Sequence, residues 1–161
     1  MRGPFRLTDT RALWIEKRRS QSAHLAAIEE ILLGKRTIVV ARGGDFDRWD
    51  LQIHGGLVGS IRAMAMVEEH GAGKQLFRLH AWPFIPQLAS GLLITLTLLA
   101  ALAAYDKAWF AAVPLALGAL GIAGFVRADC AKAMRNWCDA VNEYAAASDS
   151  PVEAPVGKPS D

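Results

Sequence analysis

Two long, uncharged apolar runs limit what this chain can fold into more than any other feature of its sequence. They read LASGLLITLTLLAALAA, from Leu88 to Ala104, and AWFAAVPLALGALGIAGFV, from Ala108 to Val126. A membrane-spanning helix needs roughly 17 to 25 apolar residues, because a rise of about 1.5 Å per residue must cross a hydrocarbon layer about 30 Å thick. Both runs reach that length. The sequence therefore predicts a transmembrane helical hairpin over residues 86–127.

Two buried helices in a soluble core are the alternative. The rest of this 161-residue chain is too small and too charged to surround two helices that are apolar on every side, so we favour the lipid bilayer. Thirteen of the eighteen Lys and Arg residues precede the first run, whereas the turn between the runs contains only Lys107. Because positive flanks stay in the cytoplasm, both termini are expected there.

Residues 1–85 are expected to form a small cytoplasmic α+β domain. The stretch SQSAHLAAIEEILLGK predicts a helix that begins near Ser20 or Ser22, ends at Gly34 and places Leu25, Ile28 and Leu32 on one face. Four strands follow, over RTIVVAR, WDLQI, SIRAMAMVEEH and KQLFRLHAW, with glycine-containing turns between them. The expected fold is one helix on a roughly four-stranded antiparallel meander, with RALWIEK as an additional edge strand.

Two of these strands carry more specific expectations. Alternation in WDLQI places Trp49, Leu51 and Ile53 on one side of the sheet. The stretch SIRAMAMVEEH contains Ala and Met, which favour helix, but a glycine turn and a plainly strand-like segment follow it. A β-hairpin is therefore the better interpretation.

The segment after the transmembrane hairpin divides into two parts. Residues 128–146 predict an amphipathic cytoplasmic helix, and residues 147–161, rich in Pro, Ser and charge, predict a disordered tail. Within the second apolar run, glycines recur every three positions and favour close packing against the first span or against a partner's helices. These glycines are Gly118, Gly121 and Gly124.

The stretch RGGDFDRWD, over residues 42–50, is the first candidate for chemistry. Asp45 and Asp47 form D-x-D, and two carboxylates at this spacing can hold Mg²⁺ or Mn²⁺ against a diphosphate. Neither a βαβ unit nor a Gly-rich phosphate loop precedes them, however. We favour a hairpin turn, because Gly supplies positive φ and Asp bonds its own backbone. Arg48 and Trp49 are further candidates for binding in this stretch.

The stretch VEEHGAG is the second candidate, for binding or interaction. On a strand, Glu68 and His70 share a face while Glu69 points the other way. If His54 and His80 approached from neighbouring strands, two His and one carboxylate could form a metal site. A solvated strand end is the more common outcome for such residues, so we expect no metal and no cofactor.

The cytoplasmic segment has a basic surplus. Residues 1–80 contain thirteen Lys and Arg against nine Asp and Glu, with a cluster in EKRRS. A basic patch on a membrane-tethered domain is attracted to anionic headgroups by about 1 kcal/mol per residue. No stretch resembles a DNA-reading helix or an RNA-binding aromatic pair, so nucleic acid is not expected as a partner.

The run RGGDFDRWDLQIHGGLVGS, continued by AMVEEHGAGKQLFRLHAWP, resembles the C-terminal region of certain bacterial family 2 glycosyltransferases of polysaccharide biosynthesis. The resemblance covers about residues 7–140, including the LW at Leu13 and Trp14. In those proteins this region follows a catalytic domain and a membrane portion. The resemblance implies a bacterial inner-membrane protein whose partner is a membrane glycosyltransferase or another glycan-assembly protein.

The chain departs from that family in one respect that affects function. It starts at Met1 without a catalytic nucleotide-sugar domain, so no transferase activity passes to any residue here. Asp45 and Asp47 are not equated with the family's metal-binding triplet. We expect a non-catalytic accessory module that works with a separately encoded transferase. The alternatives are a metal-dependent enzyme that uses Asp45, Asp47 and Glu68, and a membrane-bound regulatory subunit that senses a ligand.

Overall fold

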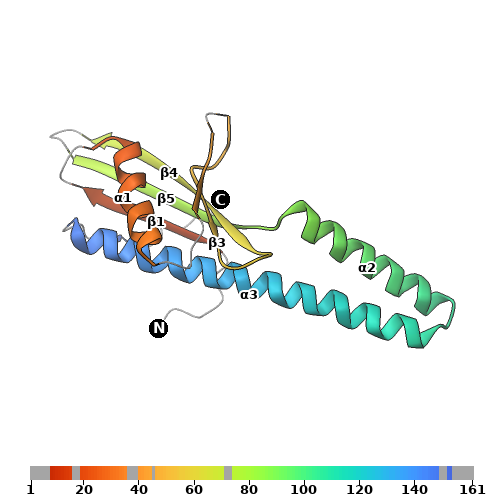
Figure 1. Cartoon of the computed structure of the whole chain (residues 1–161). Helices are drawn as coiled ribbons and strands as arrows, with labels where there is room; N and C mark the ends of the chain where they lie inside the picture. Colours follow the sequence, from red (N-terminus) through yellow and green to blue (C-terminus); the bar gives the residue numbers. More distant parts are fainter. Residues whose placement is uncertain are drawn as a thin grey trace.

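The computed structural model describes residues 8–15, 19–35, 40–44, 46–70, 74–148 and 152–153. It confirms the predicted α+β class: an antiparallel sheet has helices packed against it, and two long apolar helices extend away from the sheet (Figure 1). The sheet and its covering helices form one body, and the long helices form a hairpin that projects from it.

The sheet contains more strands than the four that the sequence predicts. Its order is β2-β3-β4-β5-β1-β6, and every neighbouring pair is antiparallel. The strands are β1 (Asp9–Ile15), β2 (Val40–Arg42), β3 (Leu51–His54), β4 (Ser60–His70), β5 (Lys74–Phe84) and β6 (Val152–Glu153).

The predicted meander corresponds to β2 through β5, and the additional strands lie beside β5. The segment RALWIEK contributes to β1 as predicted, and β1 pairs with β5 over its full length; it is not the edge strand, because β6 pairs with its other side. Two residues of the predicted disordered tail form β6 and pair with β1. The other tail residues after 148, and residues 36–39 of the predicted strand RTIVVAR, lie outside the described residues.

The helices are α1 (Gln21–Gly34), α2 (Gln87–Tyr105) and α3 (Trp109–Ala147). α1 begins at the predicted cap, where Ser20 Oγ accepts a hydrogen bond from the Ala23 backbone N–H at 3.3 Å. A tight turn joins α2 to α3, and Lys107 in that turn has a φ of 59°.

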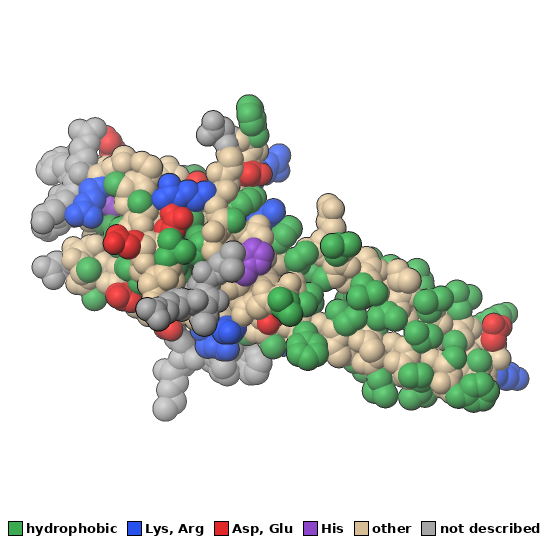
Figure 2. All heavy atoms as spheres, in the orientation of Figure 1, with side chains coloured by type: hydrophobic (Ala, Val, Ile, Leu, Met, Phe, Trp, Pro, Cys, Tyr) green, Lys and Arg blue, Asp and Glu red, His purple; other side chains and the backbone are tan. Residues whose placement is uncertain are grey.

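Both α2 and α3 are long and apolar enough to cross a membrane, judged by length and composition. Their most apolar 18-residue windows are only 6% and 17% buried, whereas the core helix of a soluble protein would be mostly buried. Apolar side chains cover the visible surface of the hairpin, and charged groups gather on the sheet domain and at the far end of the hairpin (Figure 2). The hairpin therefore has no protein layer over most of its surface within the described chain.

α3 runs unbroken for 39 residues through the point where the hairpin was expected to end. The predicted amphipathic helix is thus the second half of α3. Along the whole of α3, buried residues form two series with intervals of seven, the spacing typical of helices that pack along their length. One series is Ala112, Ala119, Val126, Ala133 and Ala140, and a second is Cys130, Trp137 and Tyr144.

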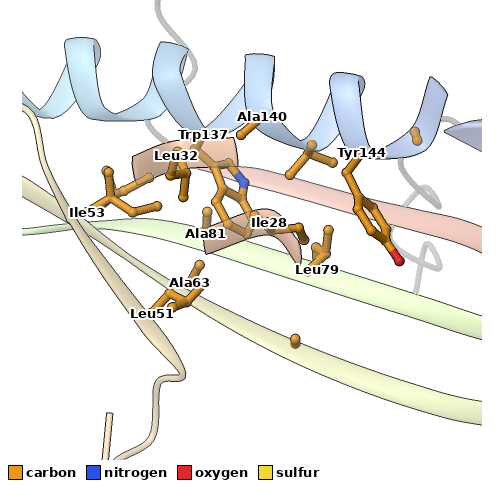
Figure 3. Packing of buried hydrophobic residues seen from close by; sticks show 14 of the residues in the cluster. Ile28, Leu32, Leu51, Ile53, Ala63, Leu79, Ala81, Trp137, Ala140 and Tyr144 are labelled. Atoms are coloured by element: carbon orange, nitrogen blue, oxygen red, sulfur yellow. The ribbon is translucent and has the colours of Figure 1, made fainter. Parts of the chain in front are cut away.

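This buried seam of α3 has different partners along its length. In the first half it faces α2, and at the end of the hairpin Val126 and Cys130 cluster with Ala89 of α2. In the second half Trp137 and Tyr144 point toward α1 and the sheet (Figure 3). A single helix therefore connects the apolar hairpin and the domain core without a flexible joint.

The domain core lies between one face of the sheet and the two helices α1 and α3. Leu51 and Ile53 of β3 are fully buried in it, as the alternation of WDLQI predicts. The expectation for Trp49 was wrong, because β3 begins only at Leu51, after a bend. The Trp49 ring instead lies beside Arg62, whose side chain belongs to the opposite face.

His24 of α1 is fully buried in this core. Its Nδ1 lies 2.5 Å from Tyr144 Oη, and its ring centroid lies 4.8 Å from that of Phe77. Desolvation by burial lowers the pKa of His24; the Gln75 side chain opposes this shift, and the charge of Arg19 adds to it. His24 is therefore neutral in the folded protein at neutral pH.

We expect the free energy of unfolding to decrease as pH falls below the ordinary His pKa of 6.5. The unfolded chain then binds a proton that the folded chain rejects, and the loss continues until pH reaches the lowered folded-state pKa. Thermal unfolding of the full chain in detergent micelles at a series of pH values measures the effect. His24→Gln should flatten the dependence, and His70→Gln, at an exposed position, should preserve it. An equally steep loss in His24→Gln contradicts the assignment.

Candidate functional site

The face of the sheet opposite the core, called the outer face below, carries apolar, aromatic and charged side chains. Both α1 and α3 pack on the core side. On the outer face Met64 and Met66 are 40% and 49% exposed. Alternate residues of β4 and β5 form its centre: Arg62, Met64, Met66, Glu68, Arg78, His80, Trp82 and Phe84.

Arg62 organises the end of the outer face from which the chain leads to α2. Its guanidinium carbon lies 3.5 Å from the centroid of the Phe84 ring and 4.8 Å from that of Trp49. Its Nε also donates a hydrogen bond to Gln52 Oε1 at 3.0 Å. Cation–π contacts of this kind hold a charged group against flat apolar surfaces. The cluster therefore presents positive charge and aromatic area together.

A second aromatic pair continues the outer face. The His80 and Trp82 rings stack with centroids 5.3 Å apart, and His80 Nδ1 lies 2.9 Å from Thr10 Oγ1 of β1. Aromatic residues, Met and Arg are enriched where proteins bind one another, and Trp and Arg are frequent among the residues that contribute most to binding. The side chains of the outer face are therefore typical of a surface that binds another protein.

The predicted acidic and histidine candidates lie at the far end of β4. Glu68 Oε1 is 3.1 Å from Arg78 Nε, and both side chains belong to the outer face. The His70 ring lies edge-on to Trp14, with centroids 5.1 Å apart. Glu69 is exposed and belongs to the opposite face of the strand. Glu68 and His70 thus contact neighbouring strands of the sheet.

The imagined site of two His and one carboxylate does not assemble in the described part of the chain. His54 Nε2 lies 3.2 Å from Gln52 Nε2, His80 contacts Thr10, and His70 lies by Trp14. Across the described residues, no three His, Cys, Asp or Glu side chains come together as metal ligands would. Asp45, half of the D-x-D triplet, lies outside those residues.

The described part of RGGDFDRWD has the geometry of a turn. Asp47 Oδ2 accepts a hydrogen bond from the Gly44 N–H at 2.8 Å, and the Asp47 N–H donates to the Gly44 carbonyl at 3.0 Å. The Gly43 N–H donates to the Asp50 carbonyl at 3.0 Å and closes the loop. Arg48 is exposed in the same turn.

Gly43 and Asp47 should respond differently to substitution. A Cβ at Gly43 would lie 2.0 Å from the Trp49 carbonyl oxygen, whereas one at Gly44 would meet Asp47 Oδ2 at an ordinary 3.6 Å. We expect Gly43→Val to lower the free energy of unfolding by about 1–3 kcal/mol. Asp47→Asn keeps an acceptor oxygen and should cost less than about 0.5 kcal/mol. Chemical denaturation followed by circular dichroism measures both, and an unchanged midpoint for Gly43→Val contradicts the turn geometry.

The three glycines of the second apolar run do not share one contact. A Cβ at Gly118 would lie 4.0 Å from Leu96 Cδ1 of α2, so this position faces the other long helix. Gly121 and Gly124 have open space within 4 Å. Ala112 and Ala119 are the buried residues of α3 in the same part of the hairpin. Packing of Gly121 and Gly124 against a partner's helices stays a prediction.

The structure reveals a junction that the sequence analysis missed. The loop between β3 and β4, GGLVG over residues 55–59, crosses α3 in direct backbone contact. Asp129 Oδ2 accepts hydrogen bonds from the Val58 N–H at 3.0 Å and the Gly59 N–H at 3.2 Å. A Cβ at Gly55 would lie 1.8 Å from the Asp129 carbonyl oxygen. Three glycines within five residues were the available signal, since such clusters mark close backbone approach.

Comparison with known proteins adds no relative: no family model matches the chain, and no curated protein matches it.

Proposed function

We propose that this chain is a non-catalytic membrane accessory module that holds a partner-binding sheet beside the bilayer. The observation that carries the proposal is the outer face, where Met64, Met66 and the Arg62 cluster are accessible while α1 and α3 occupy the other face. Exposed Met and aromatic side chains rimmed by charge are typical of protein interaction sites.

The α2–α3 hairpin is the membrane anchor in this proposal. Its exposed leucines would face lipid chains, and the long α3 would transmit the position of the anchor to the domain. Both termini lie on the cytoplasmic side of a bacterial inner membrane, because thirteen of the eighteen Lys and Arg residues precede α2 and only Lys107 lies in the turn. The outer face is then held at a fixed height above the cytoplasmic surface.

A membrane glycosyltransferase or another glycan-assembly protein is the partner that we propose. Support comes from the resemblance of residues 7–140 to the C-terminal region of family 2 glycosyltransferases. The module would contribute position and contact area, and the transferase would contribute the chemistry.

Site-specific photo-crosslinking in native membranes tests this function. A crosslinking amino acid at Met66 samples the outer face, and one at Glu30, exposed on α1, samples the opposite side of the domain. We expect Met66 to capture one membrane protein of glycan assembly and Glu30 to leave it uncaptured. Equal capture from both positions, or capture only of proteins unrelated to glycan assembly, contradicts the proposal.

A further inference from the structure

An apolar groove lies where the hairpin meets the sheet domain. α2 and α3 splay apart toward the domain and converge at the turn (Figure 1). The groove has a volume of about 560 Å³ and is bounded by the end of β5, the first turns of α2 and the middle of α3. Its lining includes Ile85, Ala89, Ile94, Ala123, Val126 and Arg127.

The groove has a buried floor and an accessible rim. Ala89, Val126 and Cys130 are each less than 10% exposed and pack together at its base. Ile85 and Ile94 on the rim are 46% and 58% exposed. Cys130 is held by its thiol contact of 3.4 Å to the Ser60 carbonyl, which fixes the floor against the sheet. The hollow is therefore part of a packed junction.

The shape of the groove favours a narrow, flexible occupant. An α-helix has a diameter of about 10 Å and a pitch of about 5.4 Å, so a volume near 560 Å³ accommodates little more than one turn of a partner helix. An acyl chain is thinner and can bend into such a space. Because α2 and α3 form most of the lining, insertion of the hairpin would bring the groove into contact with acyl chains.

The charge of one lining residue, Arg127, indicates what the headgroup of the occupant carries. Among the described residues that line the groove, Arg127 is the one charged side chain, and it follows directly after the second apolar run. A basic residue at the end of a span lies at the level of the lipid headgroups, where Arg side chains pair with phosphate. The groove thus combines an apolar lining with one cationic side chain.

We propose that this groove binds an anionic phospholipid of the surrounding bilayer, with an acyl chain over Ala123 and Val126 and the phosphate at Arg127. This inference rests on the proposed insertion of the hairpin into the membrane. The bound lipid fills the wedge between α2, α3 and β5, and it attaches the domain to the headgroup layer.

Lipid retention by the purified full chain tests the site. The probes are phosphatidylglycerol and phosphatidylcholine with identical acyl chains, supplied in equal amounts in mixed micelles and counted by native mass spectrometry. The wild-type chain should retain phosphatidylglycerol in preference. Arg127→Gln should reduce that preference about fivefold, as expected for one basic residue at the membrane surface. Ala123→Trp should fill the groove and reduce retention of both lipids at least about tenfold.

Matched controls separate the groove from general effects. Lys107→Gln removes a charge at the far end of the hairpin, and Ala116→Trp adds the same bulk at an exposed position of α3 outside the groove. Both controls should retain lipid as the wild type does. Equal retention of the two lipids by the wild type, or loss of lipid in Ala116→Trp as large as in Ala123→Trp, overturns the proposal. A wild-type dimer without lipid that Ala123→Trp converts to a monomer overturns it in favour of a second copy of the chain.

Alkaline extraction of native membranes distinguishes this failure from failure of the proposed function. If the chain stays in the membrane pellet but shows no lipid preference, the groove proposal alone falls. If alkali releases the chain, the membrane anchor and the groove proposal both fall.

Discussion

Replacing Gly55 with alanine is expected to lower the free energy of unfolding by about 3 kcal/mol, at the upper end of the usual cost of overpacking. The added Cβ would lie 1.8 Å from the Asp129 carbonyl oxygen and 2.8 Å from the Ala133 backbone nitrogen. Backbone atoms of a long helix cannot move aside as a flexible side chain does. The loop must therefore separate from α3, and the two hydrogen bonds to Asp129 are lost with it.

The Gly55 prediction is measured by chemical denaturation of the full chain in detergent micelles, followed by circular dichroism. Gly121→Ala is the matched control, because no atom beyond the neighbouring helix backbone lies within 4 Å of its added Cβ, and its expected change is less than about 1 kcal/mol. Asp129→Ala should cost about 1–3 kcal/mol by leaving the loop N–H groups without their acceptor. Equal midpoints for Gly55→Ala and Gly121→Ala contradict the close contact of loop and helix.

Trp137→Ala is expected to destabilise the domain by about 3–5 kcal/mol, the usual cost of removing a large buried aromatic side chain. Trp137 is 1% exposed and heads the largest fully buried side chains of the described structure. It points from α3 toward α1 and the sheet (Figure 3), so its loss leaves a cavity shared by three elements. The second half of α3 should then detach more readily from the sheet.

The control for Trp137 lies two residues earlier on the same helix. Arg135 is exposed, and Arg135→Ala should change the free energy of unfolding by less than about 0.5 kcal/mol. Protease resistance of the second half of α3 provides an independent readout. The packing assignment is wrong if Trp137→Ala and Arg135→Ala unfold at the same denaturant concentration.

Local patterns predicted most of the secondary structure. The first apolar run ends at Ala104, one residue before the end of α2, and the second begins at Ala108, one residue before α3, because three consecutive polar or aromatic residues separate the runs at 105–107. Ser20 capped α1 as expected, since a cap depends on neighbours within one turn. β4 formed a strand despite its Ala and Met residues, because pairing with β5 along its full length outweighs their weak helix propensity.

Features that depend on distant contacts were not predictable in the same way. The contact between Asp129 and the loop at Val58 joins residues 71 positions apart. Trp49 faced the outer side because a bend precedes β3, and alternation says nothing about residues before a strand begins.

In the candidate site, too, local features were predictable and features that need distant segments were not. That Glu68 and His70 share one face of β4 follows from strand alternation and was predicted. The Arg62 cluster was not, because Trp49, Arg62 and Phe84 come from three separate segments that only the sheet register brings together. The groove at Arg127 likewise needs β5, α2 and α3 at once.

Cysteine labelling in intact cells tests the central claim, that the α2–α3 hairpin spans the inner membrane with the sheet domain in the cytoplasm. A membrane-impermeant maleimide should label Asp106→Cys, in the turn between the helices, without permeabilisation. The wild-type chain, whose Cys130 and Cys138 lie on the cytoplasmic side of the proposed topology, should stay unlabelled, and Glu30→Cys should label only after permeabilisation. Labelling of Asp106→Cys only in permeabilised cells contradicts the account.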